Sequence, residues 1–289
     1  MGLSLQAQHR DSLWKKRTLS LAAVSAVGIG THAVLYKTWY SKADKSSFHF
    51  YNDNKEWLQM DKIGHAWSTY ILSETTHGFF EQNGYREKEA ANLSLASALI
   101  FQTAIEYFDG RSKKWGASAG DLGANVAGAM WSFGQRKLFG TIKIPLRFSS
   151  APINNLARLR PNVLGSNLPE RMLKDYNTQT YWLNFQINKL ARPTSKWPRW
   201  LGLSVGYGAQ GMLGGYRNVF TDQNGLVQDY SYIPRYRQFY LAPNISLSHL
   251  RSKHKFINYL YKLTDYIRIP TPSFEMQSAG GVKWNWLHY

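Results

Sequence analysis

Six polar residues in the N-terminal half of the chain have the types and spacing to form one chemical centre. They occur in three weakly apolar segments, as Asp61 with His65, Glu106 with Asp109, and Asp121 with Asn125. A helix places residues four apart on the same face, so the first and third groups form pairs that point one way. We therefore expect carboxylates, an imidazole and an amide to meet at a shared polar centre.

Such a centre could serve one of three purposes. His65, Glu106 and Asp121 could bind a divalent cation through oxygen and nitrogen. His65 could instead act as a base, oriented by a carboxylate, in a hydrolase or transferase acting on a phosphorylated or lipid-linked substrate. The third purpose is structural, in which buried hydrogen bonds hold helices together. No complete catalytic signature is present, so the sequence favours a structural or binding protein over an enzyme. It leaves any cofactor unknown.

Three helices are needed to position these residues. We predict them over residues 61–80, 89–108 and 119–138, with Asn83-Gly84 and Asp109-Gly110 as the breaks between them. Ser118 lies three residues before Asp121, a capping-box-like spacing, and is the predicted N-cap of the third helix. The sequence therefore predicts an N-terminal bundle of three to four helices, with residues 41–140 as its helical region.

The N-terminal segment, residues 1–40, has the pattern of an export signal. Lys15, Lys16 and Arg17 precede an uncharged run from Thr18 to Tyr36. This run is either a signal peptide or a membrane anchor, and both place the rest of the chain outside the cytoplasm. We expect a cell-envelope protein that faces the periplasm or associates with the outer membrane, with inner-membrane anchoring as the alternative.

The last 149 residues have a different pattern. Apolar and polar residues alternate at period two, as in half-buried strands, over residues 181–190, 201–208, 238–250, 274–277 and 282–289. One amphipathic helix is expected from Phe256 to Ile267. The fold class is therefore α+β, with a helical bundle followed by an antiparallel, strand-rich half that forms a sheet or a partial barrel over residues 141–289.

Charge and cysteine content narrow the classes of partner. The net charge is +17, and residues 141–289 carry +13 of it. This basic half predicts contact with an anionic membrane surface or an envelope protein partner. Nucleic acid is not expected, because the basic residues alternate with strand-like aromatic segments and no recognised binding motif is present. The absence of cysteine excludes disulfides, thiolate zinc sites and a lipidated N-terminal cysteine.

The polar residues also carry a family resemblance. Asp61-Lys62-Ile63-Gly64-His65, Glu106, Ser118, Asp121, Asn125 and Gly128 resemble the D-K-x-x-H … E … S-x-x-D-x-x-x-N-x-x-G pattern of VanZ-like membrane proteins. The pattern is closer still to the YfiM-like family of uncharacterised envelope proteins, which are described as predicted periplasmic lipoproteins. The resemblance covers roughly residues 48–135 and implies a location in the envelope. It implies no activity, and this chain departs from it by having no cysteine for lipid attachment.

Overall fold

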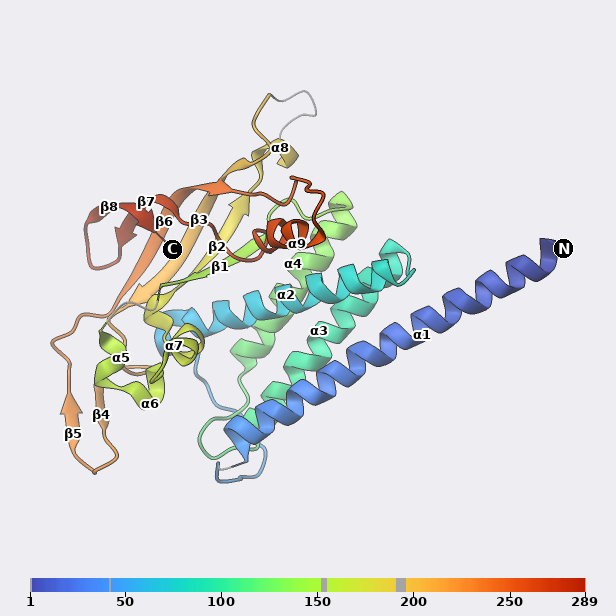
Figure 1. Ribbon diagram of the computed structural model, residues 1–289. Coiled ribbons are helices and arrows are strands. Elements are labelled where there is room, and N and C mark those ends of the chain that lie inside the picture. The colour runs from blue at the N-terminus through green and yellow to red at the C-terminus, as the bar shows by residue number, and fades with distance from the viewer. Residues whose placement is uncertain (1, 42, 152–154, 191–195, 289) are drawn as a thin grey trace. The chain divides into compact units, whose positions relative to one another are not determined.

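The computed structural model describes residues 2–41, 43–151, 155–190 and 196–288. The chain divides into two compact units. Residues 1–54 and 68–141 form the helical unit, and residues 55–67 and 142–289 form the sheet unit. Helices come first and antiparallel strands come after them, which confirms the expected α+β fold (Figure 1).

The predicted helices are all present. They are α2 (Met60–Gln82), α3 (Glu87–Gly110) and α4 (Ala119–Phe139), preceded by α1 (Gly2–Leu35) with a π-helical turn at Tyr36–Tyr40. Ser118 Oγ accepts a hydrogen bond from the backbone N–H of Asp121, so Ser118 is the N-cap that its spacing predicts. Gly140 ends α4 in the left-handed conformation that favours glycine at this position.

Within the helical unit, α1 runs beside α3 in the same direction. Arg17, in the middle of α1, forms an ion pair at 2.8 Å with Glu89 in the first turn of α3. Further along, His32 Nε2 lies 3.0 Å from the backbone oxygen of Phe101. At the far end, the Tyr40 hydroxyl donates to Asp109 Oδ1 at 2.9 Å. Contacts with α3 therefore extend from the middle of α1 to the π-helical turn that follows it.

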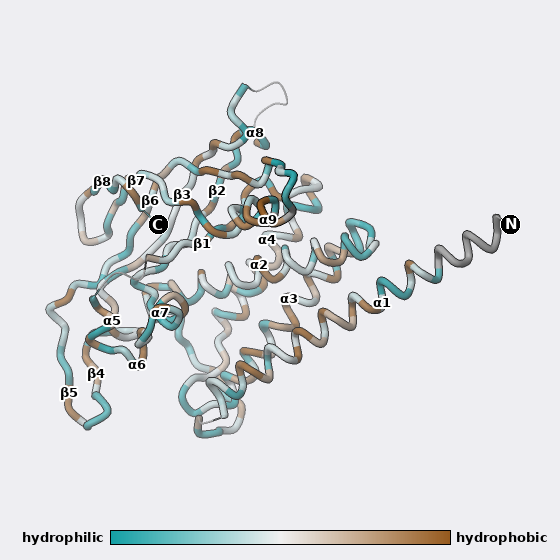
Figure 2. The backbone as a smooth tube through the Cα atoms, in the orientation of Figure 1, coloured by the Kyte–Doolittle hydropathy of each residue, from teal (hydrophilic) through white to brown (hydrophobic). Residues whose placement is uncertain are grey.

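Many of the buried side chains of the helical unit are polar, beside Tyr70, Phe80 and several alanines, and many large apolar side chains lie outside. Its fully or almost fully buried residues include Thr69, Ser73, His77, Ser94, Asn125 and Ser132. Its exposed residues include Leu19, Val27 and Ile29 on α1, Ile100 on α3, and Val126, Met130, Trp131 and Leu138 on α4. Brown, hydrophobic stretches run along α1 in Figure 2. A helical bundle in water has the opposite arrangement.

The sheet unit is built on six antiparallel strands in the order β1-β2-β3-β6-β7-β8. The strands are β1 (Leu146–Ser150), β2 (Gln179–Phe185), β3 (Leu201–Gln210), β6 (Tyr236–Ile245), β7 (Thr271–Gln277) and β8 (Val282–His288). A separate ribbon pairs β4 (Val219–Thr221) with β5 (Val227–Asp229). The short helices are α5 (Leu156–Leu159), α6 (Pro161–Leu164), α7 (Leu168–Lys174), α8 (Ile187–Leu190), α9 (Lys255–Leu263) and a 3-10 turn at Tyr176–Thr178.

Two predicted strands are too long. The strand expected over residues 181–190 ends at Phe185, and the chain then forms α8, where Lys189 and Leu190 donate to the backbone oxygen of Gln186. The strand expected over residues 238–250 ends at Ile245, and the Leu247 N–H donates to Thr264 Oγ1 instead of to a strand. Sequence analysis also missed β1. Tyr289, included in the last predicted strand, lies outside the described residues.

The sheet curls over one of its faces, which we call the covered face. The Thr180 hydroxyl oxygen of β2 lies 3.3 Å from Nε2 of His288 in β8. Three other strands lie between β2 and β8 in the sheet order. The Arg268 guanidinium lies 3.6 Å above the Trp182 ring on this face. At the edge of the sheet, Phe148 of β1 pairs with Ile267, just before β7. These contacts bring distant strands together and bury mostly polar side chains.

The first residues of α2 complete the core of the sheet unit. Met60 is fully buried in a cluster with Tyr181, Ala209 and Met212. Just before it, Trp57, Leu58 and Gln59 all have positive φ, a left-handed conformation that costs about 1–2 kcal/mol for each such residue. Later segments hold this turn: the Trp57 N–H donates to the Gly215 oxygen at 2.8 Å, the Tyr207 hydroxyl donates to the Leu58 oxygen, and Arg237 donates to Gln59.

Candidate functional site: the polar network of the helical unit

The start of α4 brings together three of the predicted polar residues. Glu106 on α3 accepts a hydrogen bond from the backbone N–H of Ser118 at 3.0 Å. The Ser118 hydroxyl donates to Asp53 Oδ1 at 2.6 Å and accepts from the Asp121 N–H at 3.1 Å. Glu106, Ser118 and Asp121 are all buried. Ser118 is therefore both a helix cap and the residue that connects the Glu106 carboxylate and the Asp121 backbone to the carboxylate of Asp53. Asp53 was not among the residues selected from the sequence.

The polar network continues along the facing sides of α2 and α4. The Thr69 hydroxyl donates to Asn125 Oδ1 at 2.9 Å, and Ser73 and Ser132 are joined at 3.3 Å. Glu74, the residue after Ser73, accepts from the Ser132 hydroxyl at 2.5 Å and from Arg136, one turn after Ser132, at 3.1 and 2.6 Å. The ion pair uses both carboxylate oxygens, which is the strong geometry for arginine and a carboxylate. Sequence analysis missed Glu74 and Arg136.

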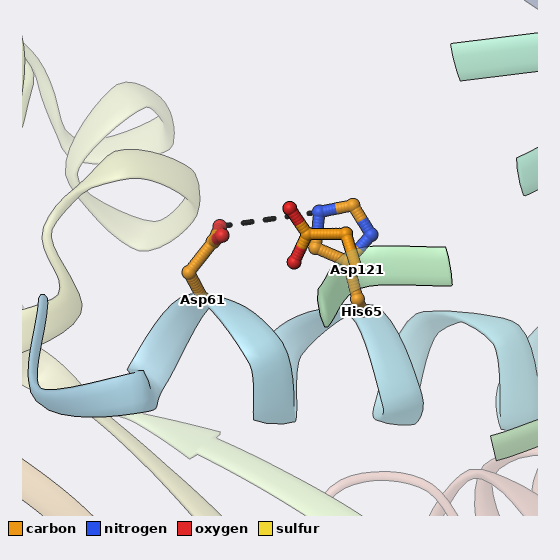
Figure 3. Close-up of side chains that lie close together, drawn as sticks. All are labelled: Asp61, His65 and Asp121. Carbon is orange, nitrogen blue, oxygen red and sulfur yellow. Dashed lines mark ion pairs between the residues drawn. The ribbon is translucent and has the colours of Figure 1, made fainter. Parts of the chain in front are cut away.

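Asp61 and His65 belong to the sheet unit. They lie on successive turns of α2, with His65 Nε2 3.9 Å from Asp61 Oδ1 (Figure 3). Asp61 also accepts from the Tyr176 hydroxyl at 2.6 Å and pairs with Lys62 at 3.1 Å. No signal in the sequence points to Tyr176, which is 115 positions away from Asp61. Asp121, drawn in the same figure, is in the first turn of α4 and is part of the helical unit.

The remaining candidate has a separate role, because Asp109 accepts from Tyr40 at the end of α1. Within the helical unit, the structure therefore links Glu106, Ser118 and Asp121, and pairs Asn125 with Thr69. Convergence of all six candidates at one centre stays a prediction. So does metal binding by His65, Glu106 and Asp121.

The string Gly206-Tyr207-Gly208-Ala209-Gln210-Gly211 has the G-x-G-x-x-G spacing of dinucleotide sites. It lies in β3 and the turn after it, and no helix comes directly after that turn. A Cβ atom at Gly206 would lie 2.6 Å from the Trp182 ring, so this glycine makes room for a buried tryptophan. Gly211 has a φ of 79°. The glycines are explained by packing and turn geometry, as expected for a glycine-rich strand.

A histidine on the covered face of the sheet predicts an acid-sensitive fold. His288 stacks on Tyr240 with ring centroids 4.2 Å apart. Burial, reinforced by the nearby Arg268, lowers the pKa of His288 from its ordinary 6.5 to about 4. The unfolded chain therefore takes up a proton on His288 at higher pH than the folded chain does. The contribution of neutral His288 to the free energy of unfolding is complete above pH 6.5 and is lost as the pH falls towards 4. The loss is about 3 kcal/mol at most.

We expect His288→Gln to remove this part of the acid sensitivity. Urea unfolding midpoints of the wild-type chain and the variant, compared between pH 7 and pH 4.5, would measure it. His249→Gln is the control, because His249 is exposed in the loop after β6. Equal acid sensitivity of the wild-type chain and His288→Gln would contradict the assignment.

The N-terminal helix and the family match bear on where the protein is located. Asp11–Tyr40 is long and apolar enough to cross a membrane, by length and composition, and the helical unit that contains it encloses a polar network. Residues 47–135 match the family described as predicted periplasmic lipoprotein (DUF2279). The family match and the signal-like N-terminal helix place the protein in the cell envelope, as the sequence predicted. No curated protein and no solved structure matches the chain.

Proposed function

We propose that this protein is an integral membrane protein of the cell envelope, and that its polar network is a structural element that joins the helices. The observation that carries the proposal is the inverted polarity of the helical unit. Ile100 on α3 is 72% exposed, whereas Thr69, Ser73 and Ser132 are fully buried. Lipid is as apolar as leucine, so helices in a bilayer associate through polar and small residues and face outward with apolar ones.

The charge distribution along α1 and α3 supports the same environment. Between Arg17 and Lys37, α1 carries no charged residue, and α3 carries none between Glu89 and Glu106. Because the two helices run side by side, their uncharged stretches lie at the same level, with charged residues at both ends. The stretch in α1 is about 28 Å long at 1.5 Å per residue, close to the thickness of a hydrocarbon core.

The contacts of α1 favour a retained anchor over a removed signal peptide. Three residues of this segment contact α3: Arg17 through an ion pair, His32 through a contact to the backbone, and Tyr40 through a hydrogen bond. Removal of α1 would leave these partners on α3 uncovered. We therefore infer that α1 is part of the mature bundle.

The polar network then needs no ligand to explain it. A polar group left alone in an apolar environment costs several kcal/mol, whereas a hydrogen-bonded one does not. The links between Thr69 and Asn125, and from Ser132 to Glu74 and Arg136, join α2 to α4 in this way. This role is the structural one among the three uses that we considered for the polar residues.

Extraction of the full chain from membranes tests the proposal. We expect it to stay in the membrane fraction after an alkaline carbonate wash, to be released by detergent, and to keep α1 in its intact mass. Aspartate at Val126 and Met130 together should prevent stable integration, because each aspartate near the bilayer centre costs about 3 kcal/mol.

The matched control is Val227→Asp, which also adds a charge at an exposed valine, but in the β4–β5 ribbon of the sheet unit. This variant should remain integrated. Release of the wild-type chain by carbonate, or a soluble and stable Val126→Asp/Met130→Asp variant, would show that the helical unit faces water.

A further inference from the structure

We propose that the sheet unit has its own lipid-contacting surface: the part of the sheet face opposite the covered face that the start of α2 leaves exposed, packed against the acyl chains of an anionic bilayer. We call it the outer face and define it by Leu183, Leu203, Val205, Phe239, Leu241, Phe274, Met276 and Trp284. The inference goes beyond the proposed function, which concerns the helical unit, and it rests on different residues.

Strand register makes the outer face continuous. Leu146 pairs with Leu183, Leu183 with Val205, Val205 with Leu241, Leu241 with Phe274, and Phe274 with Trp284. One apolar row therefore crosses all six strands. Leu241 and Phe274, in the middle of it, are 45% and 53% exposed. An apolar surface of this extent on a soluble protein marks an interaction site.

The covered face of the same strands is polar. Along β6, Gln238, Tyr240 and Asn244 are buried, whereas Phe239 and Leu241 between them are exposed. The buried polar groups have partners: Arg147 donates to Asn244 at 2.6 Å, and Gln238 donates to Glu275 at 2.6 Å. A sheet in water covers its apolar face and exposes its polar face. The reverse pattern is that of strands with an apolar face in lipid.

One end of the strands has the composition of a membrane interface. Trp200 directly precedes β3, and Trp197 and Leu250 are exposed in the adjoining loops. In α9, Phe256 and Leu260 are exposed. Exposed basic residues at this end include Lys196, Arg199, Arg251 and Lys253. Tryptophan and basic side chains collect where acyl chains meet head groups, and cations there favour anionic lipids.

The apolar row and the basic end of the strands together favour a lipid bilayer over a protein partner at the outer face. A protein partner would have to match an apolar row crossing six strands, whereas acyl chains adapt to any apolar surface of that extent. The basic and aromatic residues at one end of the strands match the head-group region of a bilayer. They do not match a buried protein interface, because the centres of such interfaces are depleted in lysine.

Site-specific labels on the full chain test the proposal. The sequence contains no cysteine, so each introduced cysteine is the sole attachment point. We would place the environment-sensitive fluorophore NBD at Val205→Cys, Leu241→Cys, Phe274→Cys and Met276→Cys in separate proteins. Val227→Cys, exposed in the β4–β5 ribbon, is the matched control. Circular dichroism would verify folding of each labelled protein.

On reconstitution into phosphatidylcholine–phosphatidylglycerol vesicles, we expect a several-fold rise in emission with a blue shift at the four outer-face positions. Lipids with a nitroxide on the acyl chain should quench these labels, and soluble iodide should not. Val227→Cys should show the opposite pattern. Iodide quenching at Leu241→Cys and Phe274→Cys would overturn the proposal, as would labels shielded from both quenchers, which would indicate a protein partner.

A label at Val126→Cys separates this proposal from the proposed function. Quenching by acyl-chain nitroxide at Val126→Cys together with iodide quenching at Leu241→Cys would retain a membrane-integrated helical unit and reject a lipid-facing sheet. The converse result would reject integration of the helical unit and support the outer face as the membrane contact.

Discussion

Replacement of Arg136 by methionine should lower the free energy of unfolding by about 3 kcal/mol, because it leaves the buried Glu74 carboxylate with only Ser132 as its hydrogen-bond donor in the network. Methionine keeps an unbranched side chain like the aliphatic part of arginine and removes the charged guanidinium. Thermal unfolding of the detergent-solubilised full chain would measure the loss as a lower Tm.

Lys137→Met is the matched control, since Lys137 is the next residue and is exposed. It should change stability by less than about 0.5 kcal/mol. The double variant Arg136→Met/Glu74→Gln should recover part of the loss, because it no longer buries an unpaired charge. Equal Tm values for Arg136→Met and Lys137→Met would show that the ion pair does not hold α2 to α4.

Gly211→Ala should destabilise the sheet unit by about 3 kcal/mol or more. Alanine would have to adopt a φ of 79°, and its Cβ would overlap the backbone oxygen of Pro234. Left-handed strain accounts for about 1–2 kcal/mol and the clash for about 1–3 kcal/mol. Loss of near-ultraviolet circular dichroism on heating would report the unfolding of this tryptophan-rich unit.

Gly225→Ala separates the two causes. Gly225 has nearly the same φ, 80°, but a Cβ there would meet no atom within 4 Å. This variant should lose only the part due to backbone strain, about 1–2 kcal/mol. A loss at Gly225 as large as that at Gly211 would assign the whole effect to backbone conformation and none to the contact with Pro234.

Sequence patterns predicted the helices and strands well, because each helix or strand is specified mainly by residues close together in the sequence. The helices of the bundle and the period-two alternation of β3 and β6 were recognisable in this way. The sequence did not predict which face of the sheet would be covered. Alternation distinguishes two faces of a strand, but it does not show whether the exposed face contacts water or lipid. Reasoning for a protein in water would bury Leu241, whereas the structure covers Gln238 and Asn244.

The candidate site was predictable only where its members are close in sequence. The spacing of Ser118 and Asp121 indicated a cap, and the structure has it. Glu74 and Arg136 were overlooked because single charged residues in a helix usually lie on a solvated surface. The contact between Asp61 and Tyr176 joins positions 115 residues apart. A contact over such a distance depends on the tertiary fold and leaves no local pattern.

The left-handed turn at Trp57–Gln59 has a consequence for how the protein is made. Gly215 and Tyr207 hold its backbone and Arg237 holds the Gln59 side chain, so the ribosome must add about 180 further residues before every partner exists. The nascent chain carries Met60 and the start of α2 uncovered during that time. We expect a chaperone or the export machinery to hold this segment, and chains truncated before Tyr207 to be cleaved there by proteases.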